Sequence, residues 1–271
     1  MTKKGFGILG IWLMLAVYPV LAQAPDGSNP TLPSRLHGPM RLHGLVPSGG
    51  VSSENWSGYA VEGSSFTYAK GSWHVPQVNC AKTPGTYSSF WVGIDGYSDS
   101  TVEQTGTESD CSGGTAQYYA WYEFYPAGSV VISSVPVSPG DKMEATVHYS
   151  GGRFTVSIKD ITTGKEFTTS KAVSGAKRTS AEWIAEAPCC TSGGGILPLA
   201  DFVVANFGED YNAMAPGSND ATDSTITNAP ISAFGSAVEE ITMVSSKGVT
   251  EATPTALTTD GTSFRVHWKA K

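Results

Sequence analysis

The sequence lacks the common signatures of hydrolytic enzymes. It contains no Gly-x-Ser-x-Gly elbow, no Asp-Thr-Gly or Asp-Ser-Gly of the aspartic peptidases, and no His-Glu-x-x-His pair of the zinc peptidases. Histidine is scarce, and after residue 50 only His74, His148 and His267 remain, each isolated in a strand-like run. We interpret these three as structural or surface residues. Carboxylates and amides are therefore the chemistry that the sequence offers.

Basic residues are also few. The chain has 17 basic and 24 acidic residues, and residues 1–50 hold four of the basic residues and one acid. The remainder therefore carries 13 basic and 23 acidic residues, a net charge of −10. This excess of negative charge argues against nucleic acid or an anionic membrane as a partner. It also limits positive self-repulsion in acid, which is compatible with an acidic working environment.

The chain begins like an export signal. Lys3 and Lys4 precede an apolar run over residues 6–21, and Ala22-Gln23-Ala24 fits a small-residue cleavage site. We expect residues 1–24 to be a signal peptide, with an uncleaved anchor as the alternative. No second apolar run of spanning length follows. We therefore expect a secreted protein that makes no membrane contact once the signal is removed.

Residues 25–50 contain five prolines and no strand or helix periodicity. They carry a short repeat, Arg35-Leu36-His37-Gly38 followed by Arg41-Leu42-His43-Gly44. The segment is either a disordered linker or a short basic prosegment that covers an acidic cleft. In the second case, acid would protonate the carboxylates of the cleft and permit self-processing near residues 45–53. Residues 51–271 have the length of one β-rich domain.

Cysteine is limited to four residues, an even number that suggests disulfides in an exported chain. Three pairings are possible. We expect Cys80 to pair with Cys111, because the two flank one segment. Cys189 and Cys190 are adjacent, so they form a strained vicinal bridge or stay free. No second pair has metal-ligand spacing, and we expect no metal or other cofactor.

From Asn55 onward the pattern is all-β. Short runs rich in β-branched and aromatic residues alternate with Gly, Pro, Ser and Asp clusters, which is typical of a sandwich or barrel. Residues 208–229 are polar and are expected to form a long loop around one weak strand. The strands that we expect are Gly71–Val75, Ser89–Ile94, Gln117–Tyr125, Lys142–Tyr149, Phe154–Ile161, Glu166–Ser170, Ala181–Ala185, Ala237–Val244 and Ser263–Trp268.

Three of these runs place carboxylates and aromatic rings on one face and apolar residues on the other. The polar faces hold Trp91 with Asp95, Trp121 with Glu123, and Glu182 with Glu186. A solvated outer face is the simple explanation, but such faces usually carry Lys, Thr and Ser. Aromatic rings beside carboxylates favour a concave binding groove. Strand alternation alone leaves open whether the groove binds a peptide or a sugar.

Five motifs in order resemble the glutamic peptidases, or eqolisins. The similarity extends over residues 54–207 and more loosely to the end of the chain. It implies a lectin-like (concanavalin A-like) antiparallel β-sandwich of two large sheets with the active site on the concave face. The motifs are Asn55-Trp56-Ser57-Gly58-Tyr59, Trp91-Val92-Gly93-Ile94-Asp95-Gly96, Glu103-Gln104-Thr105-Gly106, the run Tyr119 to Pro126 and the run Arg178 to Glu186.

The resemblance implies a catalytic pair of Gln104 and Glu186, acting in acid on unfolded protein substrates without metal or cofactor. We place the following residues around this pair as substrate-binding or supporting groups: Trp56, Trp91, Asp95, Glu123 and Glu182. The chemistry is coherent by itself, because a carboxylate can act as base and acid while an amide orients water and stabilises an oxyanion. The chain departs from the family in its short prosegment and in the Cys189-Cys190 pair.

A carbohydrate-active or carbohydrate-binding protein of the same architecture is the alternative. Glu182 and Glu186 lie four residues apart on a strand, about 13 Å, which exceeds the roughly 5 to 9.5 Å that glycosidases need. Glu186 with Glu123 or Asp95 remains open, as does a lectin that uses Trp91, Trp121 and Tyr125. We favour a monomeric endopeptidase that binds polypeptide substrates.

Overall fold

The computed structural model describes residues 35–45, 50–189, 195–208 and 219–270, together with Met1. The expected signal peptide over residues 1–24, the chain from there to residue 34, and Cys190 lie outside these ranges. Within them, no helix combines the length and apolar character that crossing a membrane requires. The same ranges contain no group of three or more His, Cys, Asp or Glu side chains arranged to hold a metal ion.

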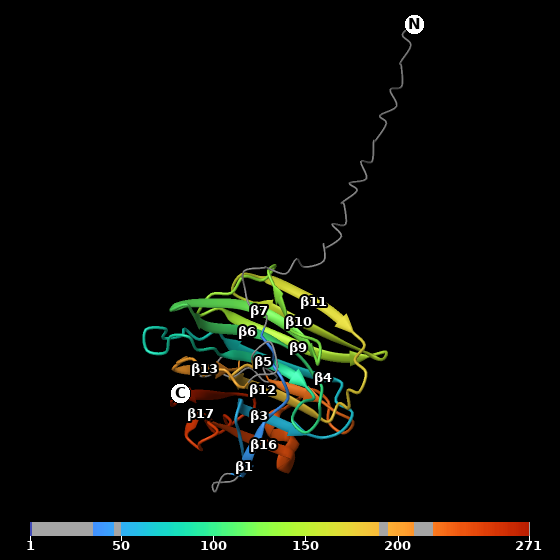
Figure 1. Ribbon diagram of the computed structural model, residues 1–271. Coiled ribbons are helices and arrows are strands. Elements are labelled where there is room, and N and C mark those ends of the chain that lie inside the picture. Colours follow the sequence, from blue (N-terminus) through green and yellow to red (C-terminus); the bar gives the residue numbers. More distant parts are fainter. Residues whose placement is uncertain (2–34, 46–49, 190–194, 209–218, 271) are drawn as a thin grey trace.

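The described chain is almost entirely β-structure (Figure 1). Its one helical element is a short 3₁₀ segment, η1, over Ile231–Ala237. The first nine strands are β1 (Leu42–Leu45), β2 (Val51–Ser53), β3 (Trp56–Glu62), β4 (Tyr68–His74), β5 (Ser89–Ile94), β6 (Val102–Ser112), β7 (Thr115–Tyr125), β8 (Val130–Ile132) and β9 (Lys142–Ser150). The others are β10 (Arg153–Asp160), β11 (Lys165–Lys171), β12 (Ser180–Glu186), β13 (Val204–Phe207), β14 (Asp220–Thr222), β15 (Ala229–Pro230), β16 (Val238–Val244), β17 (Thr250–Pro254) and β18 (Phe264–Trp268).

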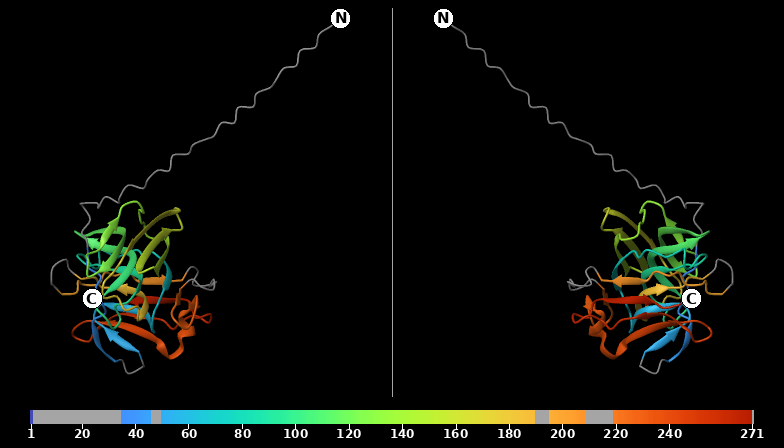
Figure 2. Two further views of the ribbon diagram at one scale, coloured as in Figure 1. Left: turned by 90° about the vertical axis from the view of Figure 1, so that its right-hand side faces the viewer. Right: turned by 90° about the vertical axis from the view of Figure 1, so that its left-hand side faces the viewer.

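The prediction of an all-β fold is confirmed, and the sheet is continuous. Hydrogen bonding runs through β8, β7, β6, β5, β12, β3 and β16, and then through β17, β18, β13, β4, β9, β10 and β11. The ladder turns back on itself, so β4, β9 and β10 pack against β5 and β6. Figure 2 shows these layers from the side. The two large sheets expected from the sequence are thus joined into one.

Tight glycine turns set the register that matters for the site. Gly113 and Gly114 have φ values of 59° and 78° and connect β6 to β7. A two-residue turn with positive φ at both positions matches the twist of a hairpin and fixes which residues face each other. From Ser112 opposite Thr115, this register places Gln104 directly opposite Glu123.

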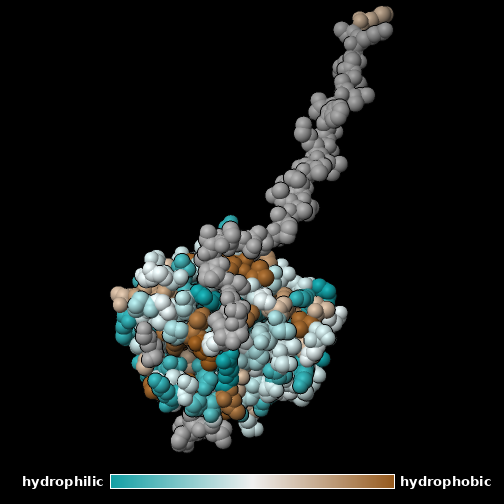
Figure 3. All heavy atoms as spheres, in the orientation of Figure 1, coloured by the Kyte–Doolittle hydropathy of each residue, from teal (hydrophilic) through white to brown (hydrophobic). Residues whose placement is uncertain are grey.

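The two faces of the central strands divide as their alternation predicts. Phe90, Val92 and Ile94 join the main apolar core together with Trp183. On the other face, Trp91 joins a second, smaller cluster whose other large members are Trp56, Trp121 and Ile184. On the side of the molecule seen in Figure 3, hydrophobic residues appear only as small separated patches. The aromatic rings of the polar face, those of Trp56, Trp91 and Trp121, are fully buried, not exposed to solvent as in an open groove.

Residues 35–45 explain this burial. They run across the face on which β7, β6, β5 and β12 lie side by side and end in β1, which pairs with β2 (Figure 1). Although residues 25–50 show no strand periodicity in sequence, Leu42–Leu45 form a strand. Of the polar stretch 208–229, the described part contains β14 and the start of β15.

Candidate active site

Four adjacent strands bring the polar residues into rows across one face. In register, one row holds Glu186, Ser89 and Glu108, the next Ile184, Trp91 and Trp121, and a third Glu182, Gln104 and Glu123. Residues directly opposite each other in antiparallel strands project to the same side of the sheet. The four strands therefore form one surface of carboxylates, an amide and indole rings.

Two glycines leave space in this surface. A Cβ atom on Gly106 would lie 2.4 Å from the carbonyl oxygen of Phe90 and 2.5 Å from Cβ of Trp91. A Cβ atom on Gly93 would lie 2.9 Å from the Trp91 ring and 3.3 Å from Cβ of Gln104. The glycines are thus required because Trp91 and Gln104 occupy the positions next to them.

Gln104 is held by Glu123. Its Nε2 donates a hydrogen bond of 3.1 Å to Oε2 of Glu123, and both side chains are fully buried. The contact orients the amide, because only the nitrogen end can donate. Burial raises the pKa of Glu123 well above its usual value, and the charge of Glu186 adds to this, while the backbone N–H of His37 and the amide of Gln104 oppose it.

Glu186, the last residue of β12, is also fully buried. Its Oε2 accepts a hydrogen bond of 2.8 Å from Nε1 of Trp91 and lies 3.3 Å from Nδ1 of His37. Oε1 makes no hydrogen bond to a described residue. Burial raises the pKa of Glu186 above its usual value, whereas the contacts from His37 and Trp91 lower it. A carboxyl with a raised pKa in a buried site is suited to accept and return a proton.

His37 joins the two candidate residues. Its carbonyl oxygen accepts a hydrogen bond from Nε2 of Gln104, and its N–H donates one of 3.0 Å to Oε2 of Glu123. Its ring stacks on Trp121 with centroids 3.7 Å apart. The sequence singled out His37 only for its charge, because nothing upstream of residue 50 indicates which strands the segment contacts.

Glu108 is a site residue that the sequence analysis missed. Its Oε1 lies 3.0 Å from Nε2 of His37, and both side chains are almost wholly buried. Burial raises the pKa of Glu108 to about 8, although Asp110 and Arg35 oppose this. Two residues along β6, Asp110 faces Arg35, with Nε 3.5 Å from Oδ2. The alternation Gln104, Gly106, Glu108, Asp110 was the available signal, but β6 was not expected as a strand.

Asp95 supports the site from a distance. Its carboxylate accepts backbone N–H bonds of 2.9, 2.8 and 2.8 Å from Lys177, Arg178 and Thr179. Arg178 has a positive φ of 59°, so these bonds hold an unusual turn immediately before β12. Burial and the neighbouring Asp99 raise the pKa of Asp95 to about 6. Asp95 therefore positions the strand that carries Glu186.

Glu182 lies in a second group of carboxyls. It is fully buried, and neither of its carboxyl oxygens hydrogen-bonds to a described residue. Burial raises its pKa well above the usual value, and the charges of Asp95, Asp99 and Glu103 add to this effect. Burial, together with the charges of Asp95 and Asp99, likewise raises the pKa of Glu103, to about 9. The register thus places Glu182 on the face of Gln104, but no hydrogen bond or ion pair of Glu182 joins it to the cluster around His37.

Indole rings form the floor of the site. Trp56 packs edge-to-face on Trp91, with ring centroids 4.9 Å apart and planes at 76°. Trp121 donates a hydrogen bond of 3.1 Å to Oγ of Ser89. All three rings are fully buried. They exclude water around Glu186 and strengthen the electrostatic interactions there.

The site residues on β5, β6, β7 and β12 lie within a stretch that matches a protein-family model, whereas His37 lies upstream of it. The model of the peptidase A4 family covers residues 54–252, and this range contains Gln104 and Glu186. The chain belongs to the peptidase A4 family. This confirms the eqolisin resemblance and supports hydrolysis of peptide bonds as the activity.

Relatives and solved structures agree with this assignment. Aspergillopepsin-2 of Aspergillus niger is 31% identical over 222 residues, which is 73% of this chain and 77% of the relative. Scytalidopepsin B of Scytalidium lignicola is 30% identical over 181 residues, or 62% and 66% of the two chains. The structure of scytalido-glutamic peptidase with a transition state analog inhibitor superposes with a TM-score of 0.65. It is 22% identical and covers 80% of this chain and 98% of that chain, so it shows the shared fold.

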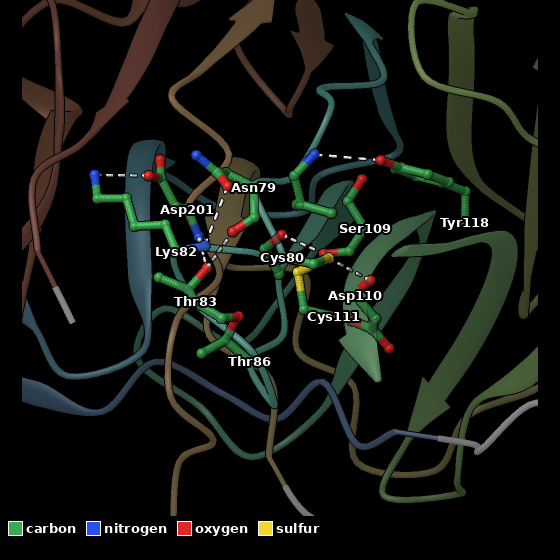
Figure 4. Close-up of a disulfide and its surroundings, with 12 residues drawn as sticks. Asn79, Cys80, Lys82, Thr83, Thr86, Ser109, Asp110, Cys111, Tyr118 and Asp201 are labelled. Carbon is green, nitrogen blue, oxygen red and sulfur yellow. Dashed lines mark hydrogen bonds and ion pairs between the residues drawn. A yellow bond between two sulfur atoms is a disulfide. The ribbon is translucent and has the colours of Figure 1, made fainter. Parts of the chain in front are cut away.

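The disulfide lies beside the acidic end of β6 in this A4 peptidase. Cys80 pairs with Cys111, as expected, and Cys111 directly follows Asp110 (Figure 4). Ser109 and Asp110 lie next to the bridge, and the loop that carries Cys80 is tied to Tyr118 through Val78 N–H, at 3.2 Å. The bridge therefore anchors the strand that carries Gln104, Glu108 and Asp110. Cys190 lies outside the described residues, so the state of the Cys189-Cys190 pair stays a prediction.

Proposed function

We propose that this protein is a secreted endopeptidase, active in acid, in which Gln104 and Glu186 hydrolyse peptide bonds of unfolded proteins. The observation that carries the proposal is that both residues contact one residue, His37, in the segment that crosses the site. Gln104 donates to the carbonyl oxygen of His37, and Glu186 lies 3.3 Å from the ring of the same residue. A peptide carbonyl in this place receives a hydrogen bond where negative charge develops during hydrolysis.

In the first step, Glu186 accepts a proton from water as the water oxygen attacks the carbonyl carbon. Oε1 is the oxygen available for this, because Trp91 occupies Oε2. The carbonyl oxygen becomes an oxyanion and is stabilised by the Nε2–H of Gln104. Glu123 keeps that amide turned toward the substrate.

In the second step, the carbon–nitrogen bond breaks and the tetrahedral intermediate collapses. Glu186 returns its proton to the departing nitrogen and is again a carboxylate. Bond breaking thus yields a carboxylic acid and an amine, with one water consumed. A carboxylate serves as the base in acid, where a histidine would be protonated.

Dependence on pH follows from the cluster as a whole. Glu186 must lose its proton to act as base. Because burial raises its pKa, the rate should rise at a pH above the range in which an ordinary glutamate ionises. Ionisation of Glu123, whose pKa is raised well above normal, adds negative charge beside Gln104 and opposes formation of the oxyanion at higher pH. The profile is bell-shaped, and its limbs report values of the coupled cluster.

The test is hydrolysis of a denatured protein by the purified, processed chain across the acidic range, from about pH 3 to pH 6. Cleavage should persist with pepstatin and a chelator present and vanish in Glu186→Gln. A reducing-end assay on polysaccharides, run with the same preparation, addresses the carbohydrate alternative. Sugar release without peptide cleavage would reject the proposed function. Mass analysis of the exported chain tests removal of residues 1–24.

A further inference from the structure

Residues 35–41 follow a continuous hydrogen-bonded path through the cleft. Before His37, Leu36 exchanges backbone hydrogen bonds of 3.4 and 2.8 Å with Cys189. After it, Asn55 bonds to the carbonyl of Pro39 and the N–H of Arg41. The segment is therefore held on both sides of the peptide unit that faces the dyad, as an extended peptide would be.

The side chain of His37 fills a pocket of its own. The Trp121 ring forms one wall, 3.7 Å from the imidazole and nearly parallel to it. Glu108 lies 3.0 Å from Nε2, and Glu186 lies 3.3 Å from Nδ1. Both ring nitrogens thus face carboxyl groups, an arrangement that an imidazole satisfies and an aliphatic side chain does not.

Spacing along β6 matches spacing along the bound segment. Glu108 and Asp110 are two residues apart on one face of the strand, and their partners His37 and Arg35 are also two residues apart. Two extended chains share this repeat, about 6.6 Å for two residues. Arg35 stacks on Tyr87 at 3.9 Å, which holds the register. The two acids of β6 therefore match alternate residues of an extended basic peptide.

The second copy of the repeat serves as an internal comparison. His43 belongs to the same tetrapeptide sequence as His37, but it lies in β1 and is one-third exposed beside Glu54. It contacts neither candidate catalytic residue in any hydrogen bond or ion pair of the described chain. Placement in the cleft, and not the local sequence, distinguishes the two copies.

We infer that Glu108 and Trp121 form a specificity pocket for an imidazole side chain on the amino side of the scissile bond, and that His37–Gly38 is the first bond cleaved. Residues 35–38 are an internal substrate that occupies the cleft of the intact chain until it is cut. This rests on the proposed function. Water adds to the carbonyl carbon of His37, the bond to the nitrogen of Gly38 breaks, and Gly38 becomes the new N-terminus. The site lies upstream of the 45–53 region that the sequence suggested.

The first experiment follows the intact secreted chain after transfer to acid. Intact-mass measurement and N-terminal sequencing should show a first new terminus at Gly38. Dilution of the protein tenfold should leave the first-order rate constant unchanged, since the bond lies in the chain's own cleft. A first terminus at Gly44 or within residues 45–53, or a rate proportional to protein concentration, would overturn the inference.

Matched variants separate the pocket from the repeat. His37→Ala should slow cleavage at residue 37 by about tenfold or more, because the contact with buried carboxyls is lost. His43→Ala removes the same residue from the second copy and should leave the rate unchanged. Equal slowing by both variants, or by neither, would contradict a pocket that selects His37.

The second experiment measures the processed enzyme on two peptides, Arg-Leu-His-Gly-Pro and Arg-Leu-Leu-Gly-Pro, each extended at both ends. The kcat/KM ratio should favour the histidine peptide by about tenfold, and Glu108→Gln should reduce that ratio toward one. Glu166→Gln, an exposed acid on β11, is the control. A ratio that Glu108→Gln does not change would refute the pocket.

The two proposals fail in different ways. If the processed enzyme degrades a denatured protein but shows no preference for histidine, only the specificity pocket is wrong. If it cleaves neither peptide nor denatured protein in acid, the proposed peptidase function itself is wrong.

Discussion

The carbonyl oxygen of His37 accepts a hydrogen bond from the side-chain amide of Gln104. The two residues are 67 positions apart in the sequence, and they meet because residues 35–41 cross the face formed by β7, β6, β5 and β12. In the proposed function, this backbone carbonyl occupies the place of a substrate carbonyl. Gln104 and Glu186, the two candidate catalytic residues, both contact His37 through their side chains.

Substitutions of Glu186 and Gln104 should distinguish the role of the base from the role of the oxyanion donor. Glu186→Gln keeps the side chain's shape but cannot accept and return a proton, so activity should fall to background. Gln104→Ala removes the oxyanion donor and should lower kcat by about 10²- to 10³-fold. Hydrolysis rates on denatured protein in acid measure both.

Glu182→Gln is the matched control for Glu186→Gln, since both residues are fully buried on β12. It should retain most of the activity, because its neighbours are Asp95, Asp99 and Glu103 and not the cluster at His37. The sequence suggested an open groove, where substitution would not affect stability. Because both side chains are fully buried, melting curves must be measured together with the rates to show that each variant is folded. An inactive, folded Glu182→Gln would overturn the assignment of the base.

Stability should fall as pH rises. Burial raises the pKa of Glu103 to about 9 and that of Glu108 to about 8, both from the ordinary glutamate value of 4.5. Between these limits the folded chain binds more protons than the unfolded chain, so the free energy of unfolding decreases with increasing pH. The contribution of both groups is fully present below about pH 4.5. Melting temperatures of Glu186→Gln, which cannot digest itself, should therefore decline from about pH 5 to pH 8.

Glu103→Gln provides the test of that cause, because a neutral amide of similar shape has no proton to lose. Its melting temperature should fall less steeply over the same pH range. Glu144→Gln, which removes a partly exposed acid paired with Lys70, should leave the slope unchanged. A slope that Glu103→Gln does not alter would show that other groups control the pH dependence.

Asp95→Ala should affect both stability and activity. It leaves three backbone N–H groups, those of Lys177, Arg178 and Thr179, without their acceptor. Each of these partly buried hydrogen bonds contributes about 0.5 to 1.5 kcal/mol, and the turn before β12 loosens without them. We expect a lower free energy of unfolding and a reduced kcat, since Glu186 depends on the position of β12. Urea unfolding and steady-state kinetics measure the two effects, and an unchanged kcat would argue against the positioning role.

Removal of the disulfide should destabilise the protein without removing a catalytic group. Cys80 and Cys111 are 31 residues apart, and closing a loop of that length contributes about 3 to 4 kcal/mol in the chain-entropy model. Cys80→Ser with Cys111→Ser should lower the free energy of unfolding by about that amount. Activity per folded molecule should persist at low temperature. Non-reducing peptide mapping of the wild-type protein is the direct check of the pairing.

Local alternation determined much of this protein from sequence alone. Ser89–Ile94 reads as a strand because its apolar residues are continuous, and the structure has β5 over the same residues. The division of β5, β7 and β12 into an apolar and a polar face was also predictable, since side chains alternate along any strand. The same rule placed Trp91, Glu123 and Glu186 on the polar faces of their strands. The Cys80–Cys111 pair was expected on another ground, because the two cysteines flank one segment.

Strand β6 marks the limit of such reasoning. Val102–Ser112 contains three acids, a glutamine and hydroxyl residues but almost no apolar side chains, so nothing in its composition indicates a strand. It is the longest strand beside β7 and is almost wholly buried. Its position between β5 and β7 stabilises it, because both edges of its backbone are hydrogen-bonded. Glu108 and Asp110 could not be identified while their strand was missing.

The sequence by itself determined the β-class, the two-faced strands, the Cys80–Cys111 pair and the candidates Gln104 and Glu186, because each depends on short-range pattern or motif. Only the tertiary structure decided that His37, and not its repeat partner His43, lies between Glu108 and Glu186. The two tetrapeptides are identical in sequence. His37 contacts Glu108 and Glu186, which are 71 and 149 residues away, whereas β1, which carries His43, pairs with the nearby β2. No local property of the chain encodes which copy meets which strand.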